Sequence, residues 1–320
     1  MSLWSRNLWD AKGKHCYVTG GSSGLGLALA TVLASRGAHV SIVARGQQRL
    51  EDAVKQIKAH AACHQEKRQN SEQIISSFSA DLCTAAGANA ALDAISEAHD
   101  GRAPDAIFLC AGVATPRFFV ESTEEDLAKG MDLGYWTEAW TAWAVTRRMV
   151  EQRRNGKIVF VASTLGYMSF VGWSSYSPAR HAVRGLADTL RSELLLYDID
   201  IHLFCPNTMT TPGYVEENRT KPQITTIIEE GDSPVTPQQA ALALLQGIAD
   251  GHTHISGDMI TELFRAATRG SAPYHNFLYD CCLDMVAFIA TPVWRSMTDS
   301  KIRAHRSEHD RYLKERGIRK

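Results

Sequence analysis

The sequence lacks several features that mark particular classes of protein. Its 34 Lys and Arg nearly balance its 35 Asp and Glu, for a formal net charge of −1, and this balance gives no general reason to expect nucleic acid as a partner. The 7 cysteines form no C-x-x-C pair and have no metal-ligand spacing with histidine, so we expect reduced thiols and no metal site. The first ten residues lack the apolar stretch of a signal peptide, and we therefore expect a cytosol-facing protein.

The chain also lacks internal repeats and any Pro/Gly/Ser-rich linker, so its 320 residues are expected to bury one large core. Helical periodicity separates six apolar runs that are rich in Val, Ile and Phe, at residues 15–18, 39–44, 75–80, 106–110, 157–162 and 199–205. Alternating strands and helices predict an α/β fold, a doubly wound parallel sheet of the Rossmann type. We expect one domain over residues 1–270 and an amphipathic, basic extension over residues 271–320.

A glycine-rich turn between the first apolar run and a helical stretch is the clearest motif. It has the pattern T-G-x-x-x-G-x-G, from Thr19 to Gly26. Glycines at such positions allow a tight turn, a close approach of backbone to phosphate, and close packing of helix on sheet. The unpaired N–H groups at a helix start favour a pyrophosphate, so we predict dinucleotide binding. The residues expected at the cofactor are Gly20, Ser22, Ser23, Gly24, Leu25 and Gly26.

A later segment departs from the alternation of strands and helices. Thr236, Pro237 and Gln239 have the pattern of a helix start, with Thr as the N-cap, Pro in the first turn and Gln three residues after the cap. The stretch before them, at residues 211–235, is therefore predicted to be an insertion. Segments at the carboxyl ends of parallel strands commonly cover ligands, and we expect this one to cover the substrate.

Three polar side chains form a candidate proton-transfer site. Ser163 follows the fifth apolar run, Tyr176 begins a helical stretch, and Arg180 comes four residues after Tyr176 on the same helix face. A cation in that position lowers the pKa of a phenol, whose ordinary value is about 10. We therefore predict that Ser163, Tyr176 and Arg180 are the catalytic residues.

Together these motifs resemble the short-chain dehydrogenase/reductase family, over about residues 14–258. The glycine turn, the Cys110-Ala111-Gly112 turn, the serine ahead of Y-x-x-x-cation and Pro206 all occur in the order and spacing of that family. The resemblance implies that Tyr176 gives a proton to a carbonyl oxygen as hydride arrives from nicotinamide, while Ser163 hydrogen-bonds the same oxygen. It also implies a homodimer or homotetramer, formed through the helices at residues 124–153 and 178–197.

Two positions differ from the family pattern. Arg180 stands where the family has lysine, and Gly134 stands where it usually has the asparagine that holds a relay water. Arginine keeps its charge but is larger and cannot release a proton. Two interpretations stay open: a rebuilt relay that retains catalysis, or an impaired protein that binds NADPH and lipid without turnover.

The end of the second apolar run bears on the choice of cofactor. Arg45, with Arg49 as a helper, suits the 2′-phosphate of NADPH, whereas enzymes that prefer NAD tend to carry an acidic residue there. The resemblance adds further expected cofactor contacts, at Asp81, Leu82, Ala111, Gly112, Tyr176, Arg180, Pro206, Thr208 and Thr210.

The segment at residues 205–214 has a narrower resemblance. Its pattern P-x-x-T-x-T-P-G-Y looks like that of 3-ketodihydrosphingosine reductases, the subfamily that reduces a sphingoid ketone in sphingolipid synthesis. This resemblance implies NADPH-dependent reduction of 3-ketodihydrosphingosine to dihydrosphingosine. The alternative within the enzyme class is a reductase of another lipid ketone, such as a steroid, a retinoid or a 3-oxoacyl chain.

The apolar tail at residues 277–294 fits such a substrate. Asp280, Asp284 and Pro292 interrupt it, so its uncharged run is shorter than the ~20 residues that span a bilayer. Basic residues follow, which suits anionic headgroups. We expect peripheral association with the cytosolic face of the endoplasmic reticulum membrane. The alternative is that the apolar residues form a dimer interface or cover the sheet.

Overall fold

The computed structural model describes residues 9–64 and 73–319. The strands of the described residues form one seven-stranded sheet, in which every neighbouring pair is parallel and the order is β3-β2-β1-β4-β5-β6-β7. Their bounds are β1 His15–Thr19, β2 His39–Ala44, β3 Ile75–Ser79, β4 Ala106–Leu109, β5 Gly156–Val161, β6 Ile199–Cys205 and β7 His254–Ser256. This is the doubly wound parallel sheet that the sequence predicts.

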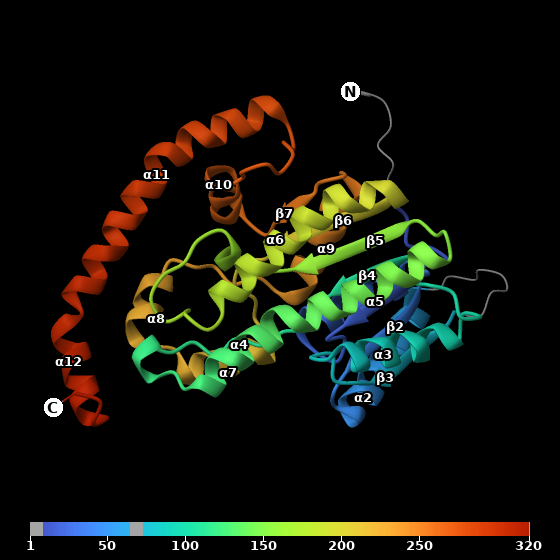
Figure 1. The fold of residues 1–320 in the computed structure, drawn as a ribbon, viewed down its shortest axis with the longest axis horizontal. Coiled ribbons are helices and arrows are strands. Elements are labelled where there is room, and N and C mark those ends of the chain that lie inside the picture. Colours follow the sequence, from blue (N-terminus) through green and yellow to red (C-terminus); the bar gives the residue numbers. More distant parts are fainter. Residues whose placement is uncertain (1–8, 65–72, 320) are drawn as a thin grey trace.

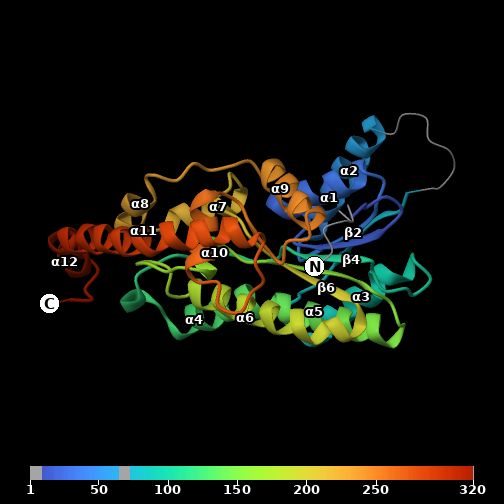
Figure 2. The same cartoon turned by 90° about the horizontal axis from the view of Figure 1, so that it is seen from above.

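Helices cover both faces of this sheet (Figure 1). In the view from above, α1 (Gly24–Ser35), α2 (Gln47–His64) and α9 (Pro237–Ala249) lie on one side, with α3 (Ala85–Glu97), α5 (Thr137–Glu151) and α6 (Ser177–Glu193) on the other (Figure 2). Each layer has its own apolar core against the sheet. Strand β1 is buried along its whole length, as expected for the centre of a sheet that is covered on both faces.

All six predicted strands are present, with ends that differ by no more than a residue from the apolar runs. The seventh, β7, has three residues and was not predicted. A run of three residues carries too little periodicity to be distinguished from a loop. Its pairing with β6 defines it as a strand, because Leu203, Phe204 and Cys205 lie beside its three residues.

Residues 60–77, a polar stretch of the sequence, are only partly described. Helix α2 extends to His64 and β3 begins at Ile75, and residues 65–72 lie outside the described part of the chain.

The helix between β4 and β5 changes its winding. It runs as α4 (Glu124–Met131), then as one π-helical turn, η2 (Asp132–Trp136), and then as α5. A π turn inserts extra backbone into a helix and is frequent at functional sites. Gly134 lies in this turn, which faces α6.

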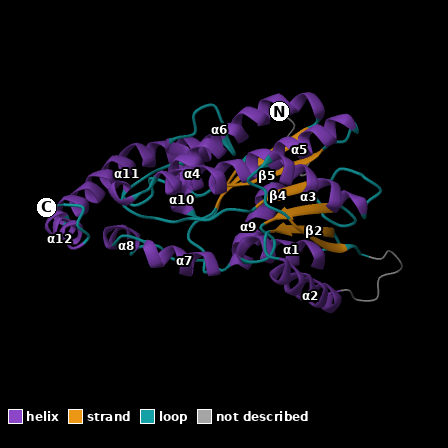
Figure 3. Cartoon of the chain, turned by 60° about the horizontal axis from the view of Figure 1, so that its bottom comes forward, coloured by secondary structure: helices purple, strands orange, loops and turns teal. Residues whose placement is uncertain are grey.

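The predicted insertion contains two short helices, α7 (Pro212–Thr220) and α8 (Gln223–Glu229). Its two ends meet where Met209 pairs with Val235, and the Thr210 N–H donates to the Val235 carbonyl. After it, Thr236 and Gln239 form a capping box at the start of α9, as the sequence predicts. Figure 3 shows α7 and α8 beyond the ends of the strands, and α8 contacts α11.

The C-terminal region forms three helices, α10 (Met259–Ala267), α11 (Phe277–Ala304) and α12 (Arg306–Glu315). Helix α11 runs along the outer edge of the molecule and passes through Pro292 without ending (Figure 1). Among the described residues it is the one helix that is long and apolar enough to cross a membrane, judged by length and composition alone.

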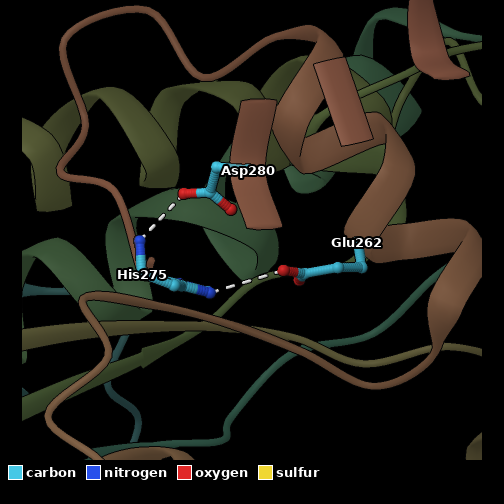
Figure 4. A group of neighbouring side chains, drawn as sticks. All are labelled: Glu262, His275 and Asp280. Atoms are coloured by element: carbon cyan, nitrogen blue, oxygen red, sulfur yellow. Dashed lines mark hydrogen bonds and ion pairs between the residues drawn. The ribbon is translucent and has the colours of Figure 1, made fainter. Parts of the chain in front are cut away.

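Helix α11 is fastened to α10 by buried ion pairs. The Arg265 guanidinium lies between the Glu262 and Asp280 carboxylates. His275 donates its backbone N–H to Asp280 and places its ring near Glu262 (Figure 4). Arg269 pairs with Asp284 one turn further along. Glu262, His275 and Asp280 have donor atoms close enough together to hold a metal ion, but Arg265 already supplies positive charge there. We assign this cluster to the attachment of α11.

Candidate active site

The glycine turn lies between β1 and α1, and its shape excludes side chains. Gly20 and Gly24 have φ values of +65° and +54°, in the left-handed region. A Cβ on Gly20 would lie 2.9 Å from the Cys110 carbonyl oxygen, and a Cβ on Gly26 would lie 2.5 Å from the Gly20 carbonyl oxygen. Helix α1 starts at Gly24, and its N-cap, Ser23, makes no side-chain capping bond. The turn thus fits a pyrophosphate, because backbone N–H groups and the Ser23 hydroxyl are not used within the helix start.

Arg45 and Arg49 follow β2 on the same edge of the sheet. Both are exposed, and neither has an ion-pair partner within residues 9–64 and 73–319. The pKa of Asp81 is lowered, first by the backbone N–H of Cys83 and in smaller part by the charge of Arg45. Leu82 beside it is buried. This places Arg45, Asp81 and Leu82 together at the ends of β2 and β3.

The ends of β4 and β6 contribute the remaining residues that are predicted to contact the cofactor. Ala111 donates its N–H to the Thr19 hydroxyl at 3.1 Å, which joins the turn after β4 to the end of β1. The Pro206 carbonyl accepts from Thr164. The hydroxyls of Thr208 and Thr210 bond to Asp232 and to the Val235 carbonyl, so both are engaged by the insertion.

Ser163 and Tyr176 lie together where β5 ends and α6 begins. The Ser163 hydroxyl accepts from the Leu165 N–H at 3.2 Å, and it lies close enough to Tyr176 to lower the pKa of that phenol slightly. Burial raises the pKa of Tyr176, the charge of Arg180 opposes that rise, and the charges of Glu217 and Glu138 add to it. Tyr176 is therefore a neutral phenol at physiological pH, the form that can donate a proton.

Arg180 is buried, and among the described residues its Nη1 has hydrogen-bond partners whereas its Nε has none. Its Nη1 donates to Glu138 Oε1 at 2.6 Å and to the Val161 carbonyl at 3.0 Å. Its Cζ lies 4.8 Å from the centre of the Tyr176 ring. Its Nη2 lies 2.7 Å from where a Cβ on Gly112 would be, so this end of the guanidinium faces the turn after β4. Arg180 therefore lies between Tyr176 and the predicted cofactor side of the site.

Gly134 makes room for this arrangement. A Cβ at Gly134 would lie 2.7 Å from the Ala179 Cβ and 3.7 Å from Arg180 Nη2. An asparagine there would collide with the start of α6. The two departures from the family pattern are thus linked. The absence of a side chain at Gly134 leaves the space that the start of α6 and Arg180 occupy.

Glu138 is a site residue that the sequence analysis missed. It is almost fully buried, and burial raises the pKa of its carboxyl while Arg180 beside it acts in the opposite direction. A buried ion pair of this kind is strongly coupled. In the sequence, Glu138 is a lone acidic residue in a largely apolar stretch, four positions after Gly134, and this could have indicated a buried charge. Nothing near it in the sequence identifies its partner, which lies 42 residues away.

An apolar pocket of about 410 Å³ adjoins the site. One wall is formed by Phe118 and Phe119 after β4, and the other by the segment between β5 and α6, including Phe170, Trp173 and Pro178. The C-terminal helices contact both walls. Arg295 of α11 donates to the Ser169 carbonyl at 2.8 Å, and the ring of His309 of α12 lies against Phe118.

The insertion is attached beside the same pocket by a charged cluster. Lys221 lies between Glu217 and Glu229, at 2.7 Å and 2.6 Å. Trp173 donates its Nε1–H to Glu229 at 3.1 Å, and Thr225 donates its hydroxyl to the Val171 carbonyl at 3.0 Å. These contacts hold α7 and α8 against the segment that carries Tyr176.

Known proteins agree with the fold and the motifs. The short chain dehydrogenase family matches residues 14–222. The chain belongs to this family, and it is therefore an oxidoreductase of the kind that works with a nicotinamide cofactor. The resemblance drawn from the sequence is confirmed at this level.

Relatives narrow the similarity further. The chain is 45% identical over 319 residues to a protein named 3-ketodihydrosphingosine reductase TSC10 from Cryptococcus neoformans, covering 99% of this chain and 93% of that protein. It is 32% identical over 262 residues to the 3-ketodihydrosphingosine reductase of Mus musculus, covering 82% and 76%. A solved short chain dehydrogenase/reductase from Burkholderia phymatum, in complex with NAD, has a TM-score of 0.70 at 22% identity over 82% of this chain and 95% of that one. This last likeness bears on the fold alone.

Proposed function

We propose that the protein reduces the ketone of 3-ketodihydrosphingosine to dihydrosphingosine with NADPH. The observation that carries this proposal is the assembly of Ser163, a neutral Tyr176 and a charged Arg180 beside the glycine turn and an apolar pocket. Similarity to reductases named for this substrate supports it.

The residues divide the chemistry in a simple way. When bound, NADPH supplies the hydride that adds to the carbonyl carbon. Tyr176 donates its proton to the carbonyl oxygen, and Ser163 donates a hydrogen bond to the same oxygen. Arg180 keeps its charge and stabilises the tyrosinate that forms, while Glu138 holds the guanidinium in place. The rebuilt relay thus retains a cation beside the phenol.

The substrate's alkyl chain suits the apolar pocket. Its lining is predominantly apolar, including Phe118, Phe119, Phe170 and Trp173, and it begins on the segment that carries Tyr176. An apolar wall with few polar groups is the usual character of a site for a lipid tail. We propose that the insertion at residues 211–235 covers the head of the substrate while this pocket takes the tail.

Purified protein tests the reaction directly. With NADPH and 3-ketodihydrosphingosine in detergent, we expect dihydrosphingosine, detected by mass spectrometry, together with NADPH oxidation.

A second candidate, a protein that binds NADPH and lipid without turnover, is favoured by one observation: Arg180 Nη1 already donates hydrogen bonds to Glu138 and to the Val161 carbonyl. NADPH binding without oxidation by any lipid ketone would establish that candidate. Faster reduction of a steroid, retinoid or 3-oxoacyl ketone would identify another substrate.

The choice of NADPH rests on Arg45 and gives a prediction. Replacing Arg45 by alanine removes a guanidinium that suits the 2′-phosphate, and a charge-assisted hydrogen bond is worth enough to raise KM for NADPH about tenfold. KM for NADH should stay unchanged. The control is Arg36→Ala, which removes an exposed guanidinium at the opposite end of α1. Equal effects of Arg45→Ala on both cofactors would contradict the assignment.

We propose that α11 lies on a membrane surface. Its buried residues, Asp280, Leu283, Ala287 and Thr298, face the protein, whereas large apolar residues on the other side are exposed, Phe288 at 82%. A helix that crosses a bilayer is surrounded by lipid, and the Asp280–Arg265 pair would have to break for that. Apolar residues outside and an ion pair inside favour peripheral attachment, which we propose is to the cytosolic face of the endoplasmic reticulum.

Vesicle binding tests this surface. Replacing Phe288 by aspartate should lower partitioning onto phosphatidylcholine/phosphatidylserine vesicles about tenfold or more, because a buried phenylalanine contributes about 1.5–3 kcal/mol. Ser300→Asp adds the same charge to an exposed position of the same helix and should have a small effect. Equal partitioning of wild type and Phe288→Asp in a flotation assay would exclude this face.

We propose that the protein forms a homodimer or homotetramer. Trp136 and Trp143 on η2 and α5, and Leu195 and Leu196 after α6, expose apolar surface on the helices that the family resemblance assigns to a homodimer or homotetramer. Exposed apolar patches of this kind mark interaction sites.

A further inference from the structure

The charged cluster in the insertion has more negative than positive charge. Lys221 is the one cation that pairs with Glu217 and Glu229 in the described part of the chain, and Asp232 adds a further negative charge near Glu229. The side chains are well shielded, with 3% of Lys221, 18% of Glu217 and 16% of Glu229 exposed. Burial raises the pKa of both glutamates and Lys221 opposes that rise. A second cation would therefore stabilise this cluster.

The cluster also presents aromatic faces to a cation. The Lys221 ammonium lies 5.4 Å from the centre of the Trp173 ring and 5.2 Å from that of Tyr214. Carboxylates combined with aromatic faces form the surroundings that bind an alkylammonium group. Lys221 is itself a primary ammonium that lies between these carboxylates and aromatic rings.

The cluster is adjacent to the proton donor. The Trp173 ring lies 5.5 Å from the Tyr176 ring, centre to centre, and Trp173 also bonds to Glu229. Glu217 is close enough to Tyr176 for its charge to act on the phenol, whereas Glu216, the next residue of α7, pairs outward with Arg219. Of these two neighbouring carboxylates, Glu217 is thus the one whose charge reaches Tyr176.

The substrate of the proposed function carries a cation close to its reacting ketone. In 3-ketodihydrosphingosine the carbon next to the ketone carries a primary amine, which is protonated at neutral pH. When the ketone oxygen bonds to Tyr176 and Ser163, the ammonium must lie within a few atoms of them. We propose that Glu217 binds this ammonium and so selects 2-amino ketones over ketones without the amine, an inference that rests on the proposed function.

Two ketones of equal chain length distinguish binding of the substrate's ammonium by Glu217 from a merely structural role of Glu217 in holding the insertion. The pair is 3-ketodihydrosphingosine and the same hydroxyketone without the amine, each measured as kcat/KM with NADPH. We expect Glu217→Gln to lower kcat/KM for the amino ketone at least tenfold, leave that for the deaminated ketone unchanged, and thus remove the preference. Glu217→Asp, which keeps the charge, should restore part of it. Glu216→Gln, a matched loss of charge on the same helix, should alter neither.

Equal losses on both ketones would overturn the proposal, because they would show that Glu217 only fastens the insertion through Lys221. If wild-type protein reduced neither ketone, the proposed function would fail, and binding would still decide the role of Glu217. In that case the affinity of the NADPH-loaded protein for dihydrosphingosine and for its uncharged N-acetyl derivative is measured. A preference for the charged ligand that Glu217→Gln abolishes supports the ammonium site, and no preference in wild type excludes it.

Discussion

Replacing Glu138 by leucine should lower the free energy of unfolding by about 3–5 kcal/mol, because it leaves the buried Arg180 charge without its carboxylate. Arg180 Nη1 would retain only the Val161 carbonyl. Urea unfolding followed by circular dichroism measures the change as a shift in midpoint at constant slope.

The double variant Glu138→Leu, Arg180→Met provides the control. Removing both charges leaves no unpaired buried ion, and replacing a buried pair by apolar residues of similar volume is often neutral or stabilising. The double variant should therefore recover most of the lost stability while losing activity. If Glu138→Leu alone were as stable as wild type, the two groups would not form the pair that the structure shows.

Replacing Tyr176 by phenylalanine should lower kcat about 10²–10⁴-fold, the usual contribution of a positioned general acid. The ring and its contact with Trp173 remain, and only the hydroxyl near Ser163 is lost. NADPH binding, measured by nicotinamide fluorescence, should stay at the wild-type level because the glycine turn is untouched. Steady-state reduction of the sphingoid ketone gives kcat.

Tyr197→Phe is the matched control for that variant. It removes an exposed hydroxyl from the turn that follows α6 and should leave kcat unchanged. A Tyr176→Phe protein with wild-type turnover would require a different proton donor, and the assignment of the site would be wrong.

The sequence predicts those parts of the fold that depend on local patterns. Continuous apolar runs, such as that of β4, identify buried parallel strands, and the glycine turn identifies where α1 begins. The N-cap at Thr236 was predicted because a capping box is a pattern of four residues. The winding of η2 was not predicted, because a π turn depends on what packs against it.

The candidate site was predictable only in part for a similar reason. Ser163, Tyr176 and Arg180 lie in a spaced motif, and the structure brings them together as that motif predicts. Glu138 does not, because its partner Arg180 lies on another helix, and Glu217 does not, because Tyr176, on which its charge acts, is distant in the sequence. The sequence indicates that Gly134 and Arg180 are two changes in one relay, but the packing of Gly134 against α6 and the pairing of Arg180 with Glu138 are seen only in the structure.

The attachment of the C-terminal helices has a practical consequence. Arg295 holds the Ser169 carbonyl, Lys301 holds that of Ile227 in α8, and Tyr312 bonds to Glu121. The tail thus contacts one wall of the apolar pocket at Ser169 and two neighbouring segments, while its outer side is apolar. A shortened chain that ends near residue 270 would retain the sheet but lose these contacts. Removing residues 271–320 to improve solubility should therefore loosen the walls of the apolar pocket.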